Sequence, residues 1–142
     1  MASVGPRRLT VAARATAVVS TTTTWAEYPR LWRALLDEVR EQGASGRNVM
    51  LYKDDVPNVE VGVLPREDFT PGGRVVRSQL PGGDVVAFTH RGPYQALGAA
   101  HEAVVGFCAE HGLERAGPRW EIYGPWREAP DQPETEVVHL LR

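Results

Sequence analysis

Two helical patterns of apolar residues divide the chain. The first begins near Thr24 or Pro29 and ends at Gly43, and its charged residues lie mostly on the face opposite its apolar residues. The second begins at Gly92-Pro93, with proline suited to the first helical position, and ends at Gly112. The apolar stripes consist of Tyr28, Leu31, Trp32, Leu35, Leu36 and Val39 in the first pattern and of Leu97, Ala100, Val104, Val105 and Cys108 in the second.

Runs rich in β-branched and aromatic residues predict strands between and around these helices. We expect the first strand to bend near Ala13 to Ala15, and a turn cluster at 54–58 predicts a hairpin. A second turn or bulge is expected at 81–84, where Pro81 and two glycines interrupt the pattern. The predicted strands are 8–23, 48–53, 59–64, 74–80, 85–90, 120–123 and 135–141.

The predicted elements follow the order strand, helix, strand, strand twice. Residues 25–43 align with 94–112 without a gap, and a two-residue insertion then places Tyr52 on Tyr123. We interpret 1–142 as one α+β domain, which would consist of a repeat at about 8–64, a connector at about 65–73 and a repeat at about 74–142. Such β-α-β-β units would form a curved antiparallel sheet with two helices on one face and a ligand groove on the other.

Strand periodicity predicts which side chains face this groove. Side chains alternate along a strand, so two faces are possible for the strands 48–53 and 120–123. The set whose apolar bulk suits packing beneath the helices is Val49, Leu51, Trp120 and Ile122. The set that would then face the groove is Met50, Tyr52, Glu121 and Tyr123. A single bulge would invert this assignment.

Glu121 is the unusual member of the groove set, because burying a carboxylate beside aromatic residues is costly unless something offsets the charge. A cationic or hydrogen-bonding ligand would offset it, since aromatic faces attract cations and a desolvated carboxylate adds direct charge pairing. The alternative is that Glu121 pairs with Arg119 or Arg127 at a surface edge.

Four further residues are candidates for the same groove. Phe88 and His90 share one face of their predicted strand and could line it. Trp25 and Trp126 lie at an element end and in a loop, where they could roof the groove or simply cap the hydrophobic core.

Composition excludes several functional classes. The chain of 142 residues has 16 basic and 18 acidic residues, and their interspersion argues against direct nucleic-acid binding. No apolar run has the length of a membrane span, and Arg14 interrupts the region 9–19 that faintly resembles a signal peptide. The single cysteine, Cys108, excludes an internal disulfide and is typical of the cytoplasm.

The chain also lacks the common catalytic and cofactor motifs. Its four histidines show no metal-ligand spacing with Cys108, and we expect no metal site. It contains no nucleophile-elbow motif, no Walker-type phosphate loop and no dinucleotide fingerprint, so we expect no cofactor.

Three segments together resemble the GyrI-like small-molecule-binding superfamily, which includes the effector-binding domains of multidrug-sensing transcription activators. They are Val85-Val-Ala-Phe-Thr-His-Arg-Gly-Pro-Tyr94, Gly117-Pro-Arg-Trp-Glu-Ile-Tyr123 and Thr135-Glu-Val-Val-His-Leu-Leu141, with a looser match at 48–52. The resemblance implies a groove between the two repeats, in which Glu121 contacts cationic, hydrophobic ligands. It also implies that Tyr52 and Tyr123 are turned toward that groove.

This resemblance implies three possible functions. The first is a stand-alone binding protein for hydrophobic, planar or cationic molecules, acting in sequestration or sensing. A fused DNA-binding domain is not expected, because the repeat accounts for both predicted helices. The second is a hydrolase that detoxifies cyclopropane-containing natural products, with Glu121 orienting or activating water. The third is a regulator that binds a protein partner such as a topoisomerase.

Overall fold

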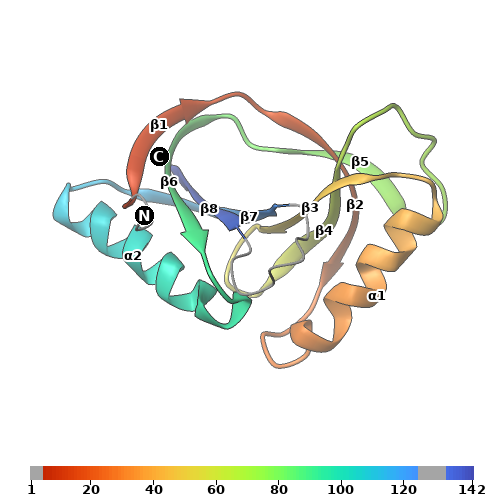
Figure 1. Ribbon diagram of the computed structural model, residues 1–142, viewed down its shortest axis with the longest axis horizontal. Helices are drawn as coiled ribbons and strands as arrows, with labels where there is room; N and C mark the ends of the chain where they lie inside the picture. The colour runs from red at the N-terminus through yellow and green to blue at the C-terminus, as the bar shows by residue number, and fades with distance from the viewer. Residues whose placement is uncertain (1–4, 125–133) are drawn as a thin grey trace.

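The computed structural model describes residues 5–124 and 134–142 as an α+β fold built on one eight-stranded sheet (Figure 1). The helical elements are α1 (Tyr28–Glu41), the 3-10 turn η1 (Tyr94–Ala96) and α2 (Leu97–Glu110). The strands are β1 (Arg7–Val11), β2 (Arg14–Thr22), β3 (Gly46–Tyr52), β4 (Asn58–Pro65), β5 (Val75–Leu80), β6 (Gly83–Arg91), β7 (Arg115–Tyr123) and β8 (Glu134–Leu141). The predicted fold class and curved antiparallel sheet are confirmed.

Strand pairing joins two groups of elements at the centre of the sheet. The strand order is β1-β6-β8-β7-β3-β4-β2-β5, and each pair is antiparallel. The predicted hairpin is β3–β4, and the order strand, helix, strand, strand occurs as β2-α1-β3-β4 and as β6-α2-β7-β8. The central pair β3–β7 places Met50 opposite Glu121 and Tyr52 opposite Arg119.

The first predicted strand is two strands that belong to opposite ends of the sheet. β1 pairs with β6, whereas β2 pairs with β4 and β5, and the chain breaks between them near the predicted bend. A similar break separates β5 from β6. The two breaks touch, because a Cβ atom on Gly82 would lie 2.6 Å from the backbone nitrogen of Ala13. Glycine at position 82 therefore allows the two connections to pass each other.

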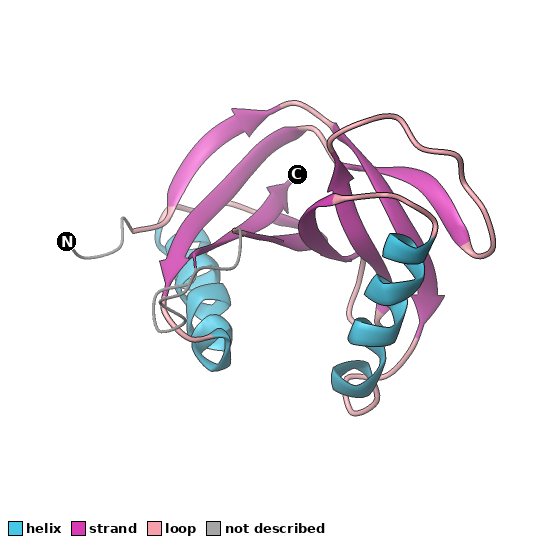
Figure 2. Cartoon of the chain, turned by 45° about the vertical axis from the view of Figure 1, so that its right-hand side comes forward, coloured by secondary structure: helices cyan, strands magenta, loops and turns pink. Residues whose placement is uncertain are grey.

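Both helices pack on the face of the sheet that carries Met50 and Glu121, so the predicted placement of the groove opposite the helices is wrong. Helix α1 packs in a core that includes Met50 and Tyr52, and α2 packs in a separate core with Val86 and Val137. Figure 2 shows the two helices standing apart on the same side of the arched sheet. The space between them, and not the reverse face, is where the central strands are left uncovered.

Side chains on the reverse face of the curved sheet pack against one another, so this face is buried without a helix. The residues that we expected beneath the helices, Val49, Leu51, Trp120 and Ile122, are buried instead against side chains from β1, β5, β6 and β8. Leu9 and Leu80 come from the two edge strands, and the curvature of the sheet brings both into this one cluster. Period-two alternation identifies the two faces but does not show which one is covered by helices.

The helix predictions are accurate for the first helix and for both C-terminal ends, whereas α2 begins at Leu97, after the 3-10 turn η1, and not at Gly92-Pro93. Helix α1 begins at Tyr28, and Gly43 and Gly112, which follow the two helices, adopt positive φ angles of 87° and 63°. Val105, predicted to lie on the apolar face of α2, is 37% exposed. Within the described ranges no helix is long and apolar enough to cross a membrane.

The close approach of strands β2 and β4 at Gly62 can be tested by substitution. A Cβ atom on Gly62 would lie 1.8 Å from the carbonyl oxygen of Ala17, so Gly62→Ala should lower the free energy of unfolding by about 2–3 kcal/mol. The matched control is Gly106→Ala on α2, where an added Cβ atom would meet nothing within 4 Å. This substitution should stabilise the helix by up to about 1 kcal/mol. Urea unfolding measures both; equal effects would contradict the close approach of the strands.

Candidate functional site

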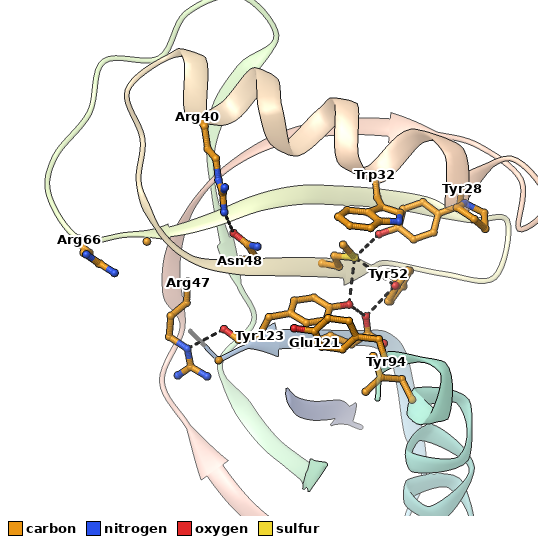
Figure 3. A pocket seen from close by; sticks show the side chains of 15 residues that line it. Tyr28, Trp32, Arg40, Arg47, Asn48, Tyr52, Arg66, Tyr94, Glu121 and Tyr123 are labelled. Carbon is orange, nitrogen blue, oxygen red and sulfur yellow. Dashed lines mark hydrogen bonds between the residues drawn. The ribbon is translucent and has the colours of Figure 1, made fainter. Parts of the chain in front are cut away.

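A cavity of about 660 Å³ lies between α1 and α2, over the central strands β3 and β7 (Figure 3). Its volume is in the range of small-molecule sites. Its aromatic wall consists of Tyr28, Trp32, Tyr52, Tyr94 and Tyr123. Residues from both helical regions and from both central strands are needed to form it, so the cavity depends on the pairing of β3 with β7.

The four residues of the predicted groove set all line this cavity. Met50 and Tyr52 come from β3, and Glu121 and Tyr123 come from β7. The register pairs Met50 with Glu121, so an apolar side chain faces the only carboxylate among the residues that line the cavity in the described part of the chain. Strand alternation therefore gave the correct cavity-facing residues, although it gave the wrong position for the helices.

Glu121 is buried and fully engaged by neutral or titratable donors. The residue is only 5% exposed to solvent. Oε1 accepts hydrogen bonds from the hydroxyls of Tyr52, at 3.0 Å, and Tyr123, and Oε2 lies 2.8 Å from Nε2 of His101. Within residues 5–124 and 134–142, no lysine or arginine forms an ion pair with this carboxylate.

The two tyrosines are held in their protonated form. Burial raises the pKa of Tyr52 and of Tyr123 above the ordinary phenol value, and the charge of Glu121 raises both further. A protonated phenol can donate to a carboxylate, whereas a phenolate would repel it. Both hydroxyls therefore solvate Glu121 in place of water, and neither neutralises its charge.

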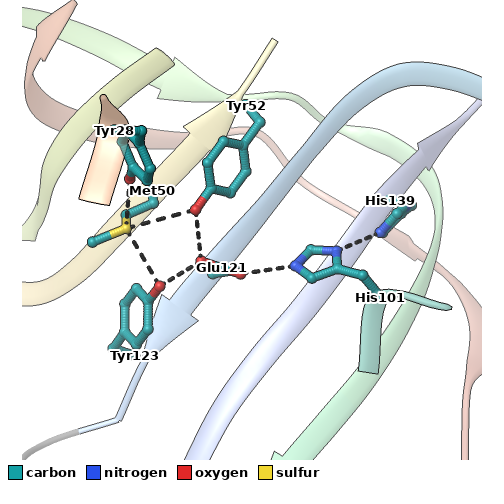
Figure 4. A network of polar contacts seen from close by, with 7 residues as sticks. All are labelled: Tyr28, Met50, Tyr52, His101, Glu121, Tyr123 and His139. Atoms are coloured by element: carbon teal, nitrogen blue, oxygen red, sulfur yellow. Dashed lines mark hydrogen bonds and ion pairs between the residues drawn. The ribbon is translucent and has the colours of Figure 1, made fainter. Parts of the chain in front are cut away.

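A pair of histidines extends the contacts of Glu121 behind the cavity wall (Figure 4). Nδ1 of His101, on α2, lies 2.8 Å from Nε2 of His139, on β8. Because a carboxylate only accepts, His101 Nε2 carries a hydrogen, and the shared hydrogen of the pair resides on either His101 or His139. Burial, and then the neighbouring His101, lowers the pKa of His139 to about 3, so His139 is neutral near pH 7.

Met50 forms the apolar pole beside the carboxylate. Its sulfur lies 2.7 Å from the hydroxyl of Tyr28 and 3.3 Å from that of Tyr123. Thioether sulfur is a weak acceptor, and the single hydroxyl hydrogen of Tyr123 is already donated to Glu121, so Tyr28 is the phenol that donates to the sulfur. The cavity floor thus combines a charged oxygen pair, a polarisable sulfur and three phenol rings.

The alternative pairing of Glu121 with Arg119 is not observed. Arg119 pairs with Asp55 at 3.0 Å, and its guanidinium lies 5.5 Å from the ring centroid of Trp25 and 5.8 Å from that of Tyr52. Trp25 is 45% exposed and packs on Tyr52, but it is not among the residues that line the cavity. Arg127 and Trp126 lie outside the described residues.

The two candidates on β6 also lie away from the cavity. Phe88 packs against the core beneath α2. His90 is placed with Nε2 3.2 Å from the carbonyl oxygen of Pro93. Neither side chain is among the residues that line the cavity, so the structure separates this pair from the four residues on β3 and β7.

Several residues of the site were not predicted, although the sequence carried a signal for two of them. His101 falls on the same helical stripe as Leu97 and Val104. His139 lies two residues after the buried Val137 and therefore shares its face of β8. Tyr28 and Trp32, predicted only as members of the first apolar stripe, also line the cavity. The remaining cavity residues that we did not predict are Pro29, Arg40, Gly46, Arg47, Asn48, Arg66, Tyr94, Leu97 and Gly124.

Within the described ranges, no group of three or more His, Cys, Asp or Glu side chains could hold a metal ion. Cys108 is buried in the core beneath α2, and burial raises the pKa of its thiol. The titratable groups at the site are the carboxylate, the phenols and the histidine pair.

The aromatic cavity with its buried carboxylate has the size and lining of a small-molecule site, and the sequence comparison gives the family. Residues 6–141 match the family model described as the GyrI-like small molecule binding domain. The match covers nearly the whole chain, so the protein belongs to the GyrI-like family. No sequence among the curated proteins matches significantly.

Solved structures with the same fold include binding proteins and proteins described as hydrolases. The EcmrR C-terminal domain is 16% identical, with a TM-score of 0.78 and coverage of 100% of this chain and 99% of that chain. SAV2435 bound to tetraphenylphosphonium is 11% identical, with a TM-score of 0.75 and coverage of 98% and 94%. A hydrolase from Listeria innocua is 15% identical, with a TM-score of 0.62 and coverage of 97% and 92%.

These identities are low, so the likenesses show the fold alone. EcmrR has also been solved in complex with DNA, and the present chain spans only 57% of that longer EcmrR chain, with a TM-score of 0.76 and 16% identity.

The depressed pKa of His139 predicts a dependence of stability on pH. In the unfolded chain this histidine binds a proton near pH 6.5, whereas in the folded chain it does so only near pH 3. Stability should therefore fall as the pH drops from about 6.5 toward 3, by up to about 1.4 kcal/mol per pH unit from this group. Denaturant unfolding at pH 7 and pH 5 should show that His139→Gln reduces the difference between the two pH values by about 1–2 kcal/mol. An unchanged difference in the variant would show that His139 does not carry it.

Proposed function

We propose that this domain binds hydrophobic, planar or cationic compounds, with Glu121 as the counter-charge. The observation that carries the proposal is a 5%-exposed carboxylate that lines an aromatic cavity and has no lysine or arginine partner within the described residues. A buried carboxylate held only by phenols and an imidazole keeps its attraction for a cation. The tyrosines keep Glu121 in place before the ligand arrives.

The cavity provides the other interactions that such a ligand requires. Its five aromatic side chains offer ring faces to a flat or aromatic guest, and ring faces attract cations. The structure of SAV2435 with tetraphenylphosphonium supports this ligand class, since that protein has the same fold. We assign direct ligand contact to Glu121, Tyr123, Tyr52 and Met50, and a supporting position behind Tyr52 to Trp25.

Binding without turnover would serve sequestration or sensing. Membership of a small-molecule-binding family suits either role, and the likeness to EcmrR, whose structure was solved in complex with DNA, supports sensing. A protein partner such as a topoisomerase stays a prediction from the sequence resemblance, and cavity geometry does not bear on it.

Glu121→Gln tests the counter-charge directly. The substitution keeps the side-chain shape but removes the charge, so it should weaken binding of tetraphenylphosphonium by roughly tenfold or more, a loss of about 1.4 kcal/mol or greater. Binding of neutral triphenylphosphine oxide should change only mildly. Isothermal titration calorimetry measures both affinities.

The matched control is Glu102→Gln on α2, an exposed residue next to His101 that does not line the cavity. It removes the same formal charge and should leave both affinities close to those of the unaltered protein. If Glu121→Gln and Glu102→Gln behave alike, the counter-charge role of Glu121 is wrong.

One observation favours a second candidate, a hydrolase that opens cyclopropane rings. Glu121, His101 and His139 form a continuous chain of titratable groups that begins in the cavity and ends in the core. A carboxylate that can pass a proton to a histidine is suited to orient or activate water. The likeness to a hydrolase from Listeria innocua gives additional, fold-level support.

Turnover distinguishes the hydrolase from the binder. The protein is incubated with an excess of a cyclopropane-containing electrophilic natural product, and mass spectrometry follows the mass gain of one water. A hydrolase should convert many equivalents of substrate, and Glu121→Gln should abolish conversion. Tight binding without any ring-opened product would exclude the hydrolase and leave the binding proposal intact.

A further inference from the structure

Three arginines line the end of the cavity away from Tyr52 and Tyr94 (Figure 3). Arg40 comes from the last turn of α1, Arg47 from the beginning of β3, and Arg66 from the residue that follows β4. Three separate elements therefore bring cationic side chains to one region. We call Arg40, Arg47 and Arg66 the basic end of the cavity.

The basic end is separated from the carboxylate along the central strands. Arg47 precedes Met50 by three residues on β3, and Met50 pairs with Glu121. Strand rise of about 3.3 Å per residue places these two backbone positions about 10 Å apart. A single ligand of ordinary size can therefore reach both Glu121 and the basic end.

Two of the three arginines of the basic end are held by neutral acceptors. Nε of Arg47 donates to the carbonyl oxygen of Tyr123 at 3.1 Å, and a terminal nitrogen of Arg40 donates to Oδ1 of Asn48 at 2.8 Å. No carboxylate of residues 5–124 or 134–142 forms an ion pair with any of the three. Elsewhere in the same ranges, five arginines do form ion pairs: Arg8, Arg74, Arg77, Arg91 and Arg119.

A structural role accounts for only one of these side chains. Arg40 lies in the last turn of α1, where a cation interacts favourably with the helix dipole. Arg47 is half-buried, and its Nε contact with Tyr123 orients the guanidinium while leaving both terminal nitrogens free of any described hydrogen bond. Arg47 and Arg66 therefore carry the inference.

We propose that the basic end is an anion subsite, so that the preferred ligands are zwitterionic amphiphiles. The cationic, aromatic part of such a ligand lies against Glu121 and the tyrosines, and its carboxylate, sulfonate or phosphate lies against Arg47 and Arg66. Guanidinium groups present paired donors that match these anions. This inference rests on the proposed function, because it assigns the second half of the same ligand.

A matched pair of probes tests the subsite. Hexyltriphenylphosphonium is a simple cation, whereas carboxypentyltriphenylphosphonium has the same cation and a chain of similar length that ends in a carboxylate. The unaltered protein should bind the carboxylate probe about three- to tenfold more tightly than the hexyl probe. Calorimetry at low and at moderate salt gives both affinities, and added salt should reduce the preference.

The double variant R47Q/R66Q should remove the preference by weakening the carboxylate probe by about the same three- to tenfold, with little change for the hexyl probe. Arg66→Gln alone alters an exposed side chain, so it should fold normally and lose part of the preference. The matched control is Arg30→Gln, an exposed arginine of α1 that does not line the cavity, and it should retain the full preference.

The outcomes separate the two levels of the proposal. If the hexyl probe binds and depends on Glu121, but the carboxylate probe has no arginine-dependent advantage, the subsite is wrong and the proposed function stands. If neither probe binds, both are overturned. If Arg30→Gln removes the preference as strongly as R47Q/R66Q, the effect is one of overall charge and the subsite is wrong.

Discussion

A buried carboxylate requires hydrogen-bond donors, and this requirement ties the parts of the domain together. Glu121 on β7 receives its donors from Tyr52 on β3, from Tyr123 on its own strand and from His101 on α2. Loss of one donor would leave a buried charged oxygen less solvated. The free energy of that loss is larger than the net stabilisation that an ordinary exposed hydrogen bond provides. The register of β3 with β7 and the docking of α2 on the sheet are therefore both preconditions of the site, and the site in turn depends on elements from both halves of the chain.

The nature of these donors decides what the carboxylate can do. An arginine partner would have neutralised Glu121, whereas phenols solvate the charge and would leave it available to a cationic guest in the proposed binding mode. His101 differs from the phenols, because a proton on its ring would turn a neutral donor into an internal cation. His139, buried and neutral near pH 7, accepts or donates at the far nitrogen and so allows either arrangement of the shared hydrogen. The same chain of contacts suits a responsive binding site and a water-activating one.

Much of this arrangement could be predicted from the sequence, because strand alternation and helical spacing are local properties. They gave the hairpin, both helices and the cavity-facing set Met50, Tyr52, Glu121 and Tyr123. They could not give the side on which the helices pack, since that depends on how far the sheet curves. Curvature brings Leu9 and Leu80 over Trp120, which fills the face that we expected the helices to cover. They also could not give His101 as a partner of Glu121, because that contact joins a helix and a strand 20 residues apart.

The distribution of charge along the cavity argues for selectivity as well as affinity. A cavity with a carboxylate alone would accept any hydrophobic cation, and its specificity would rest on shape. Cations at the other end change this, because a guest whose second end is also cationic is repelled there, while a guest with an anionic end is attracted. Glu121 is buried and its field is strong at short range, whereas Arg66 is exposed and more screened by salt. In the proposed binding mode the carboxylate would therefore dominate binding strength, and the arginines would decide among ligands that satisfy it equally well.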